Sequence, residues 1–95
     1  MSGHDMTHRM KPGACVRTSV HSEGAVFLHV WDARLFAANP VGAEIWKGIE
    51  RQLDSDAIAA ELHERYGVPC ETTRAHVIRF ILELERAGLA ERRLP

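Results

Sequence analysis

The sequence is poor in the features that secreted, metal-binding and membrane proteins depend on. Its two cysteines, Cys15 and Cys70, stand far apart with no companion at metal-ligand spacing, so both are expected to be free thiols in a reducing compartment. The longest apolar stretches, 25–28 and 77–82, are far shorter than the ~20 residues that a bilayer requires. Residues 1–10 do not resemble a signal peptide. We therefore expect a cytoplasmic protein without a membrane segment.

An excess of charge of one sign is also missing. The chain has 12 basic and 13 acidic residues, which gives a formal net charge of −1. Proteins that bind nucleic acid through its phosphates carry a positive excess, so such a role would need a local basic patch. At 95 residues the chain has room for one domain, and a small core favours a shallow surface groove over a deep catalytic cleft.

Motifs of catalysis and of metal binding are absent as well. The sequence has no nucleophile elbow, no glycine loop for phosphate, no His-Glu-x-x-His and no paired-carboxylate motif. Its six histidines show no paired spacing on one helix face. We predict a protein that is not an enzyme and that uses neither a metal nor a cofactor.

The spacing of the apolar residues changes about half-way along the chain, from the alternation typical of strands to the spacing typical of helices. Residues 1–10 are polar and precede Lys11-Pro12-Gly13, which predicts a disordered tail. Alternating and β-branched residues predict antiparallel strands at 14–20, 25–31 and 35–38. Asn39 and Pro40 then predict the start of a helix over about 40–51, in which Trp46 is expected in the core.

Two further helices are predicted after this one. Ser55 is expected to cap a helix over 56–66 that ends at Gly67, and a longer helix over about 71–87 is expected to end at Gly88. Residues 91–95 are expected to form a charged tail. The sequence therefore predicts an α+β domain over 11–90, with a three-stranded antiparallel sheet followed by three helices.

The third predicted helix carries more apolar surface than a core-facing stripe needs. Ile78 and Leu82 lie about 60–100° further round the helix than Ile81, on one side only. Either the rest of the domain covers this shoulder, or it lines a groove. Beside the unpaired edge of a sheet, such a groove could accept a peptide as an added strand. The strand at 35–38 is the expected edge.

A run of short motifs resembles the PqqD family of peptide-binding domains, also called RiPP recognition elements. The resemblance covers about residues 11–90 and depends on the order of its pieces: Asn39-Pro40-Val41-Gly42-Ala43-Glu44-Ile45-Trp46, Ile58-Ala59-Ala60-Glu61-Leu62, Tyr66-Gly67-Val68, and a long helix with Val77, Phe80, Ile81, Leu84 and Gly88-Leu89. Three positions depart from the family pattern: 51–55 lacks an Asp-Gly turn, His76 replaces an Asp, and Ala38 replaces a Leu.

The resemblance implies a winged-helix-like domain that binds the leader of a ribosomally synthesised precursor peptide, as in biosynthesis of the coenzyme PQQ. The leader would lie antiparallel along the third strand, against the third helix, and be presented to a modifying enzyme such as a radical SAM protein or a leader peptidase. Carried over by position, the peptide-binding residues would be Leu35, Phe36, Ala37, Ala38, Arg74, Ile78, Ile81, Leu82 and Glu85. Ile78 and Leu82 would hold apolar leader side chains, and Arg74 could pair with an acidic one.

Two other functions stay open at this point. Arg74, Arg79 and Arg86 on one helix could contact DNA, although Glu83 between the last two favours local ion pairing instead. Phe27, His29 and Trp31 alternate along one strand and could form a dimerisation surface, which is compatible with peptide binding in a homodimer.

Overall fold

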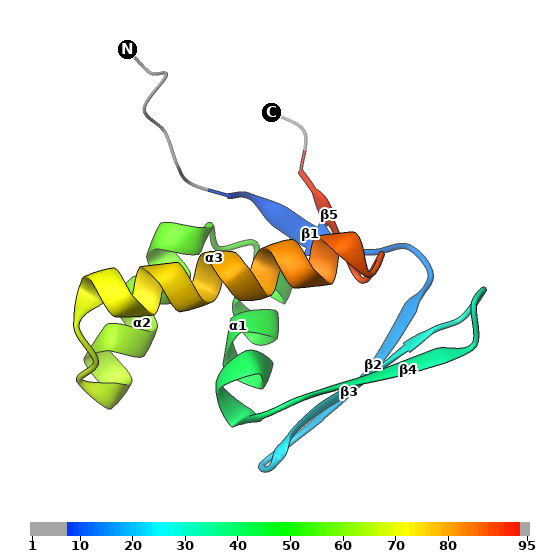
Figure 1. Ribbon diagram of the computed structural model, residues 1–95, viewed down its shortest axis with the longest axis horizontal. Coiled ribbons are helices and arrows are strands. Elements are labelled where there is room, and N and C mark those ends of the chain that lie inside the picture. Colours follow the sequence, from blue (N-terminus) through cyan, green and yellow to red (C-terminus); the bar gives the residue numbers. More distant parts are fainter. Residues whose placement is uncertain (1–7, 94–95) are drawn as a thin grey trace.

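The computed structural model describes residues 8–93 and has the predicted α+β architecture (Figure 1). The elements follow in the order β1 (Met10–Pro12), β2 (Val16–His21), β3 (Gly24–His29), β4 (Arg34–Ala38), α1 (Pro40–Glu50), α2 (Ser55–Tyr66), α3 (Cys70–Arg86) and β5 (Ala90–Arg92). Strands β2, β3 and β4 form the expected three-stranded antiparallel sheet. A second sheet, in which β1 pairs with β5, was not predicted.

Side chains at the helix starts explain where α1 and α2 begin. Asn39 caps α1 as predicted, because its Oδ1 accepts a hydrogen bond from the Gly42 N–H at 2.9 Å. The predicted cap of α2 is wrong by one residue: Asp54, not Ser55, accepts from the Ala57 N–H at 2.8 Å. Ser55 is buried, and its Oγ accepts from the His8 N–H.

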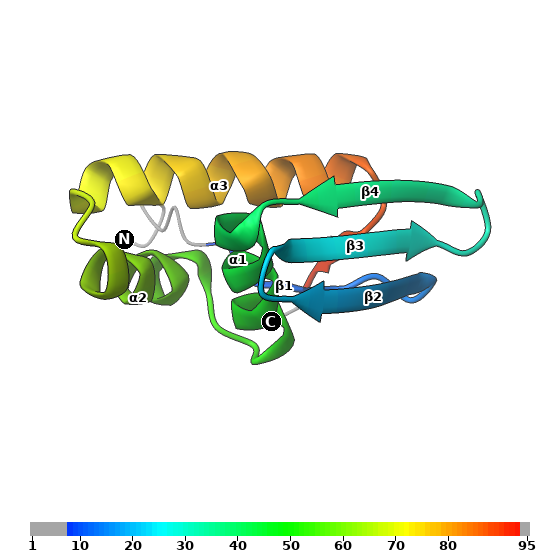
Figure 2. The same cartoon turned by 90° about the horizontal axis from the view of Figure 1, so that it is seen from below.

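The core forms where α1 packs against the inner face of the sheet. Trp46 on α1 is 1% exposed and meets Phe27 on β3 edge to face, with ring centroids 4.8 Å apart. Figure 2 shows α1 at one end of the strands and α3 running beside β4. Arg65 on α2 donates a hydrogen bond to Glu44 on α1 at 2.6 Å, which joins the two helices. This hydrogen bond raises the pKa of Arg65 above its ordinary value.

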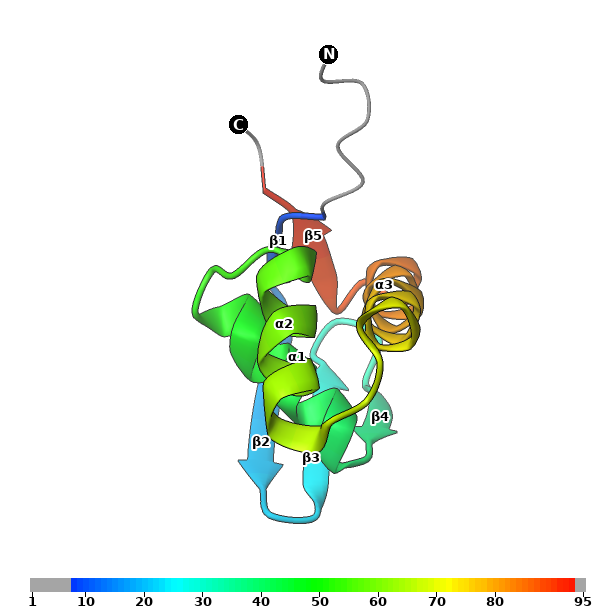
Figure 3. The ribbon, with the colours of Figure 1, turned by 90° about the vertical axis from the view of Figure 1, so that its left-hand side faces the viewer.

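The ordered domain extends beyond the predicted boundaries of 11–90. Met10 was expected in a disordered tail, yet it is 0% exposed and lies in the core. Its strand pairs with β5, which continues to Arg92 into the predicted C-terminal tail. Figure 3 shows this pair at the opposite end of the molecule from the β2–β3 turn. The remainder of the two predicted tails, 1–7 and 94–95, lies outside the described residues.

The described residues contain neither a membrane-spanning helix nor a cluster of metal ligands. Within residues 8–93, no helix combines the length and the apolar character that crossing a membrane demands. Over the same residues, His, Cys, Asp and Glu side chains do not gather in groups of three or more that could hold a metal ion.

Candidate peptide-binding cleft

Strand β4 lies at one edge of the main sheet. The strand order is β2-β3-β4, so β4 pairs on one side only, and the prediction that residues 35–38 form an edge strand is confirmed. In Figure 2, α3 runs along this open side of β4. An edge strand offers unpaired backbone N–H and C=O groups, which another extended chain can bind.

The direction of these groups follows from the pairing of β3. In an antiparallel sheet, successive residues of a strand direct their backbone groups to opposite neighbours. The Val30 N–H donates to the Cys15 carbonyl at 2.8 Å, on the β2 side. By alternation Phe27, three residues earlier, directs its groups toward β4, where its partner is Phe36. The backbone of Phe36 is therefore engaged with β3.

The backbone groups of the residues on either side of Phe36 point away from β3. Leu35 and Ala37 direct their N–H and C=O groups to the open edge, because backbone groups alternate along the strand. These two residues give an incoming strand two pairs of hydrogen-bonding groups. Their side chains lie on the outer face of the sheet, and that of Leu35 is 70% exposed.

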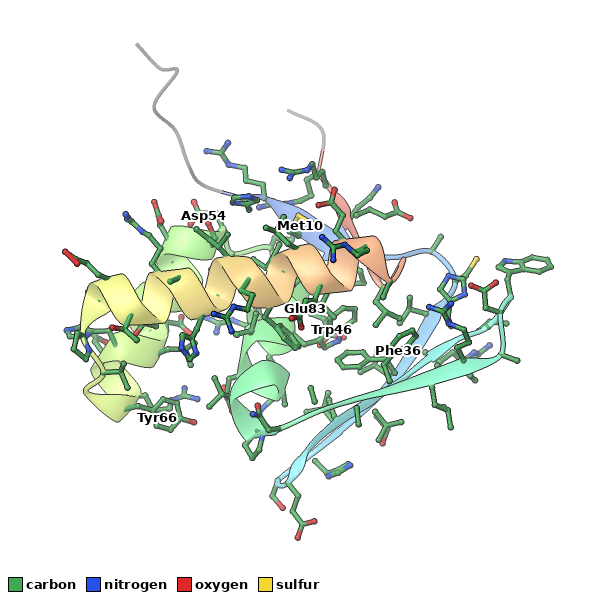
Figure 4. The ribbon with its side chains drawn as sticks, viewed as in Figure 1. Met10, Phe36, Trp46, Asp54, Tyr66 and Glu83 are labelled. Atoms are coloured by element: carbon green, nitrogen blue, oxygen red, sulfur yellow. The ribbon has the colours of Figure 1, made fainter. Side chains whose placement is uncertain are left out.

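A cleft of about 490 Å³ lies between β4, the start of α1 and one side of α3. The β4 end supplies Ala37, Ala38 and Asn39, and α1 supplies Val41, Gly42 and Ile45. The wall from α3 consists of His76, Arg79, Phe80 and Glu83. Figure 4 shows Glu83 on the side of α3 that faces Phe36. The cleft thus combines an apolar floor with a charged wall beside the open edge of β4.

The predicted helix contributors lie elsewhere. Arg74 is directed to α2, where its Nε lies 3.2 Å from Asp56 Oδ1. Glu85 accepts from Arg92 Nε on β5 at 3.0 Å. Ile81 is 0% exposed and belongs to the core. None of these three residues lines the cleft.

The apolar shoulder, Ile78 and Leu82, lies on the same flank of α3 as Arg74 and Glu85, away from the cleft. At about 100° per residue, Ile78 and Leu82 fall beside Arg74 and Glu85, whereas the cleft residues fall on the opposite flank of the core stripe. Ile78 and Leu82 therefore lie on the flank of α3 that does not line the cleft, and their contact with a peptide stays a prediction. Sequence periodicity measures the width of an apolar stripe but cannot tell which flank lies next to a given strand.

The α3 wall of the cleft is formed by residues that were not among the predicted peptide-binding residues. Phe80, named above only as part of the long helix that resembles the family, is half-buried with its ring at the cleft. His76, which stands where the family pattern has an Asp, is exposed and lines the cleft. The expected local pairing of Glu83 does not occur, since no ion pair joins it to Arg79 or Arg86 among residues 8–93. The spacing of 76, 79, 80 and 83 was the signal that could have identified this face.

The two alternative surfaces are not formed as the sequence suggested. Arg74 is paired with Asp56 and lies about 120–140° round α3 from Arg79 and Arg86, so the three arginines do not share one face. Phe27 is 1% exposed in the core, whereas Trp31 is 80% exposed. Phe27, His29 and Trp31 therefore present no common exposed surface.

A family model agrees with this fold. The model described as coenzyme PQQ synthesis protein D (PqqD) matches residues 24–90, from β3 to the start of β5. The chain belongs to the PqqD family. The match spans β4, α1 and α3, so it includes every element that lines the cleft.

Solved structures show the same PqqD-type fold. One is TbiB1 in complex with the TbiA(beta) leader peptide, with a TM-score of 0.81 and 22% identity, over 90% of this chain and 99% of that chain. Another is lasso peptide synthetase B1 complexed with the leader peptide, with a TM-score of 0.80 and 17% identity, over 92% of this chain and 99% of that chain. Among curated proteins, none matches the chain significantly.

Proposed function

We propose that this PqqD-family protein binds the leader segment of a ribosomally synthesised precursor peptide as an added strand on β4. The observation that carries the proposal is the open edge at Leu35 and Ala37 beside the cleft under α3. Both structural neighbours described above are complexes with leader peptides, which supports the same class of ligand.

Binding divides between the backbone and the cleft. Hydrogen bonds to Leu35 and Ala37 supply affinity that does not depend on the peptide's sequence. Alternate side chains of the added strand project toward α3, where Phe80 and Val41 offer apolar contacts and Arg79 and Glu83 offer charges. The backbone thus holds the leader, and the cleft selects it.

The domain's role in this proposal is to bind and to present. The modification itself is assigned to a separate enzyme, such as a radical SAM protein or a leader peptidase, and the encounter takes place in the cytoplasm where the precursor is translated. One copy of the chain supplies both walls of the cleft, so a homodimer is not required for binding.

The test removes one outward N–H without disturbing the β3–β4 ladder. Ala37→Pro deletes a donor at the open edge, and Thr18→Pro is a matched control because the same alternation directs the Thr18 N–H to the free edge of β2. Isotope-labelled protein is titrated with the leader of the precursor encoded beside its gene, and amide shifts are followed.

We expect wild-type shifts to centre on Leu35 and Ala37, affinity to fall at least tenfold in Ala37→Pro, and Thr18→Pro to bind normally. Both variants are first checked for a dispersed amide spectrum. Unchanged affinity in a folded Ala37→Pro variant would overturn the proposal. The proposal would also be overturned if duplex DNA, titrated in place of the peptide, caused amide shifts confined to the arginines of α3.

A further inference from the structure

Two opposite charges on the cleft wall lack the partners that other charges in the fold have. Arg51 binds Glu61 with both guanidinium NH groups, and Arg92 reaches across from β5 to Glu85. Arg79 and Glu83 are one helical turn apart, a spacing that permits pairing, yet neither forms an ion pair within residues 8–93. Both side chains line the cleft instead.

The spacing of these charges matches that of a β-strand. Four residues of helix rise by about 6 Å, and two residues of strand by about 6.6 Å. Residues i and i+2 of a strand also project to the same side. A peptide paired with β4 can therefore place one side chain opposite Arg79 and the next side chain of the same face opposite Glu83.

The direction of the peptide decides the order of its charges. Helix α3 runs opposite to β4, as Figure 2 shows, so a strand antiparallel to β4 runs in the same direction as α3 and reaches Arg79 before Glu83. All strand pairs among the described residues are antiparallel, and antiparallel pairing is slightly more stable per residue.

We propose that Arg79 and Glu83 select leaders with an acidic residue two positions before a basic one, the acidic side chain meeting Arg79 and the basic one Glu83. This inference rests on the proposed function and specifies its ligand. The intervening residue projects to the outer face of the sheet, beside the Leu35 and Ala37 side chains, where no charge of the cleft reaches it.

The experiment is a selection from a displayed library of random 12-residue peptides. It is run against the wild-type protein, the charge-swapped variant Arg79→Glu/Glu83→Arg, and the matched swap Arg51→Glu/Glu61→Arg on the α1–α2 surface. Ala37→Pro serves as the counter-selection target, so that only peptides dependent on the β4 edge are counted. Each swap preserves net charge.

In wild-type selections we expect acidic-x-basic peptides to exceed basic-x-acidic ones by about threefold to tenfold, as fits two exposed ion pairs gained against two repulsions. The cleft swap should reverse this ratio, and the remote swap should leave it unchanged. Synthetic peptides from the selected pool should show the same exchange of affinities between the two proteins.

Failure of the inference is distinguishable from failure of the proposed function. Peptides that need the β4 edge but show no charge order, or keep their order in the cleft swap, would overturn the inference and leave strand addition standing. A basic-x-acidic preference would overturn the assigned direction and with it the inference. No enrichment over Ala37→Pro in any selection would overturn both.

Discussion

Gly42 on α1 approaches Phe80 on α3 so closely that a Cβ added at Gly42 would stand 3.0 Å from Cζ of the ring. The same Cβ would lie 2.9 Å from the Ala38 Cβ on β4. The missing side chain therefore allows β4, α1 and α3 to meet at the inner end of the cleft. The small Ala38 and the bare Gly42 leave room that the ring of Phe80 partly fills.

Replacing Gly42 with alanine should displace that ring into the cleft. We expect Gly42→Ala to lower the free energy of unfolding by about 1–3 kcal/mol. The new methyl group would lie too close to the Ala38 Cβ, which is bonded directly to the backbone and cannot move aside as a flexible side chain can. Urea denaturation measures this change, and peptide titration should show weaker binding. The prediction would be contradicted if Gly42→Ala raised the free energy of unfolding by about 1 kcal/mol, as replacing an ordinary glycine within a helix by alanine does. That result would mean that the close contact is relieved without cost.

The two flanks of α3 should respond differently to substitution. Leu82 is 40% exposed and lies on the flank away from β4, so Leu82→Asp is expected to leave peptide affinity within twofold of wild type. Phe80→Ala removes the aromatic ring from the α3 wall of the cleft and should weaken binding at least fivefold. Isothermal titration of both folded variants decides the matter. Weakened binding by Leu82→Asp alone would restore the shoulder to the peptide site.

Met10 should stabilise the domain although it stands near the N-terminus. Its side chain is 0% exposed, so we expect Met10→Ala to cost about 2–5 kcal/mol of unfolding free energy. Lys11→Ala is the neighbouring control: its ammonium lies 3.9 Å from Glu91 in an exposed pair and should contribute less than about 1 kcal/mol. Thermal and urea unfolding compare the two. Equal, small effects would show that β1 adds little to the core.

Local signals account for the parts of this fold that could be predicted. Asn39 followed by Pro40 marks a helix start through one side-chain hydrogen bond and one preset dihedral, both within four residues. Gly67 ends α2 with a φ of 71°, a conformation that glycine adopts easily. The edge position of β4 followed from its direct connection to the first helix.

Parts that depend on distant contacts could not be predicted in the same way. Ser55 and Asp54 are both good capping residues, and only the approach of His8 explains why the Ser55 hydroxyl is buried and used elsewhere. Met10 has a polar neighbourhood in sequence, and its burial depends on β5 at the other end of the chain. The flank of α3 that faces β4 was likewise set by packing, not by periodicity.

Pairing of β1 with β5 has a consequence for how the domain can be tethered. The two strands that lead to the chain ends lie side by side, away from the cleft between β4 and α3 (Figure 1). A linker joined at either strand would therefore leave the edge of β4 unobstructed. Attached in this way to a catalytic module, the domain would raise the effective concentration of its captured peptide near that module without any further contact.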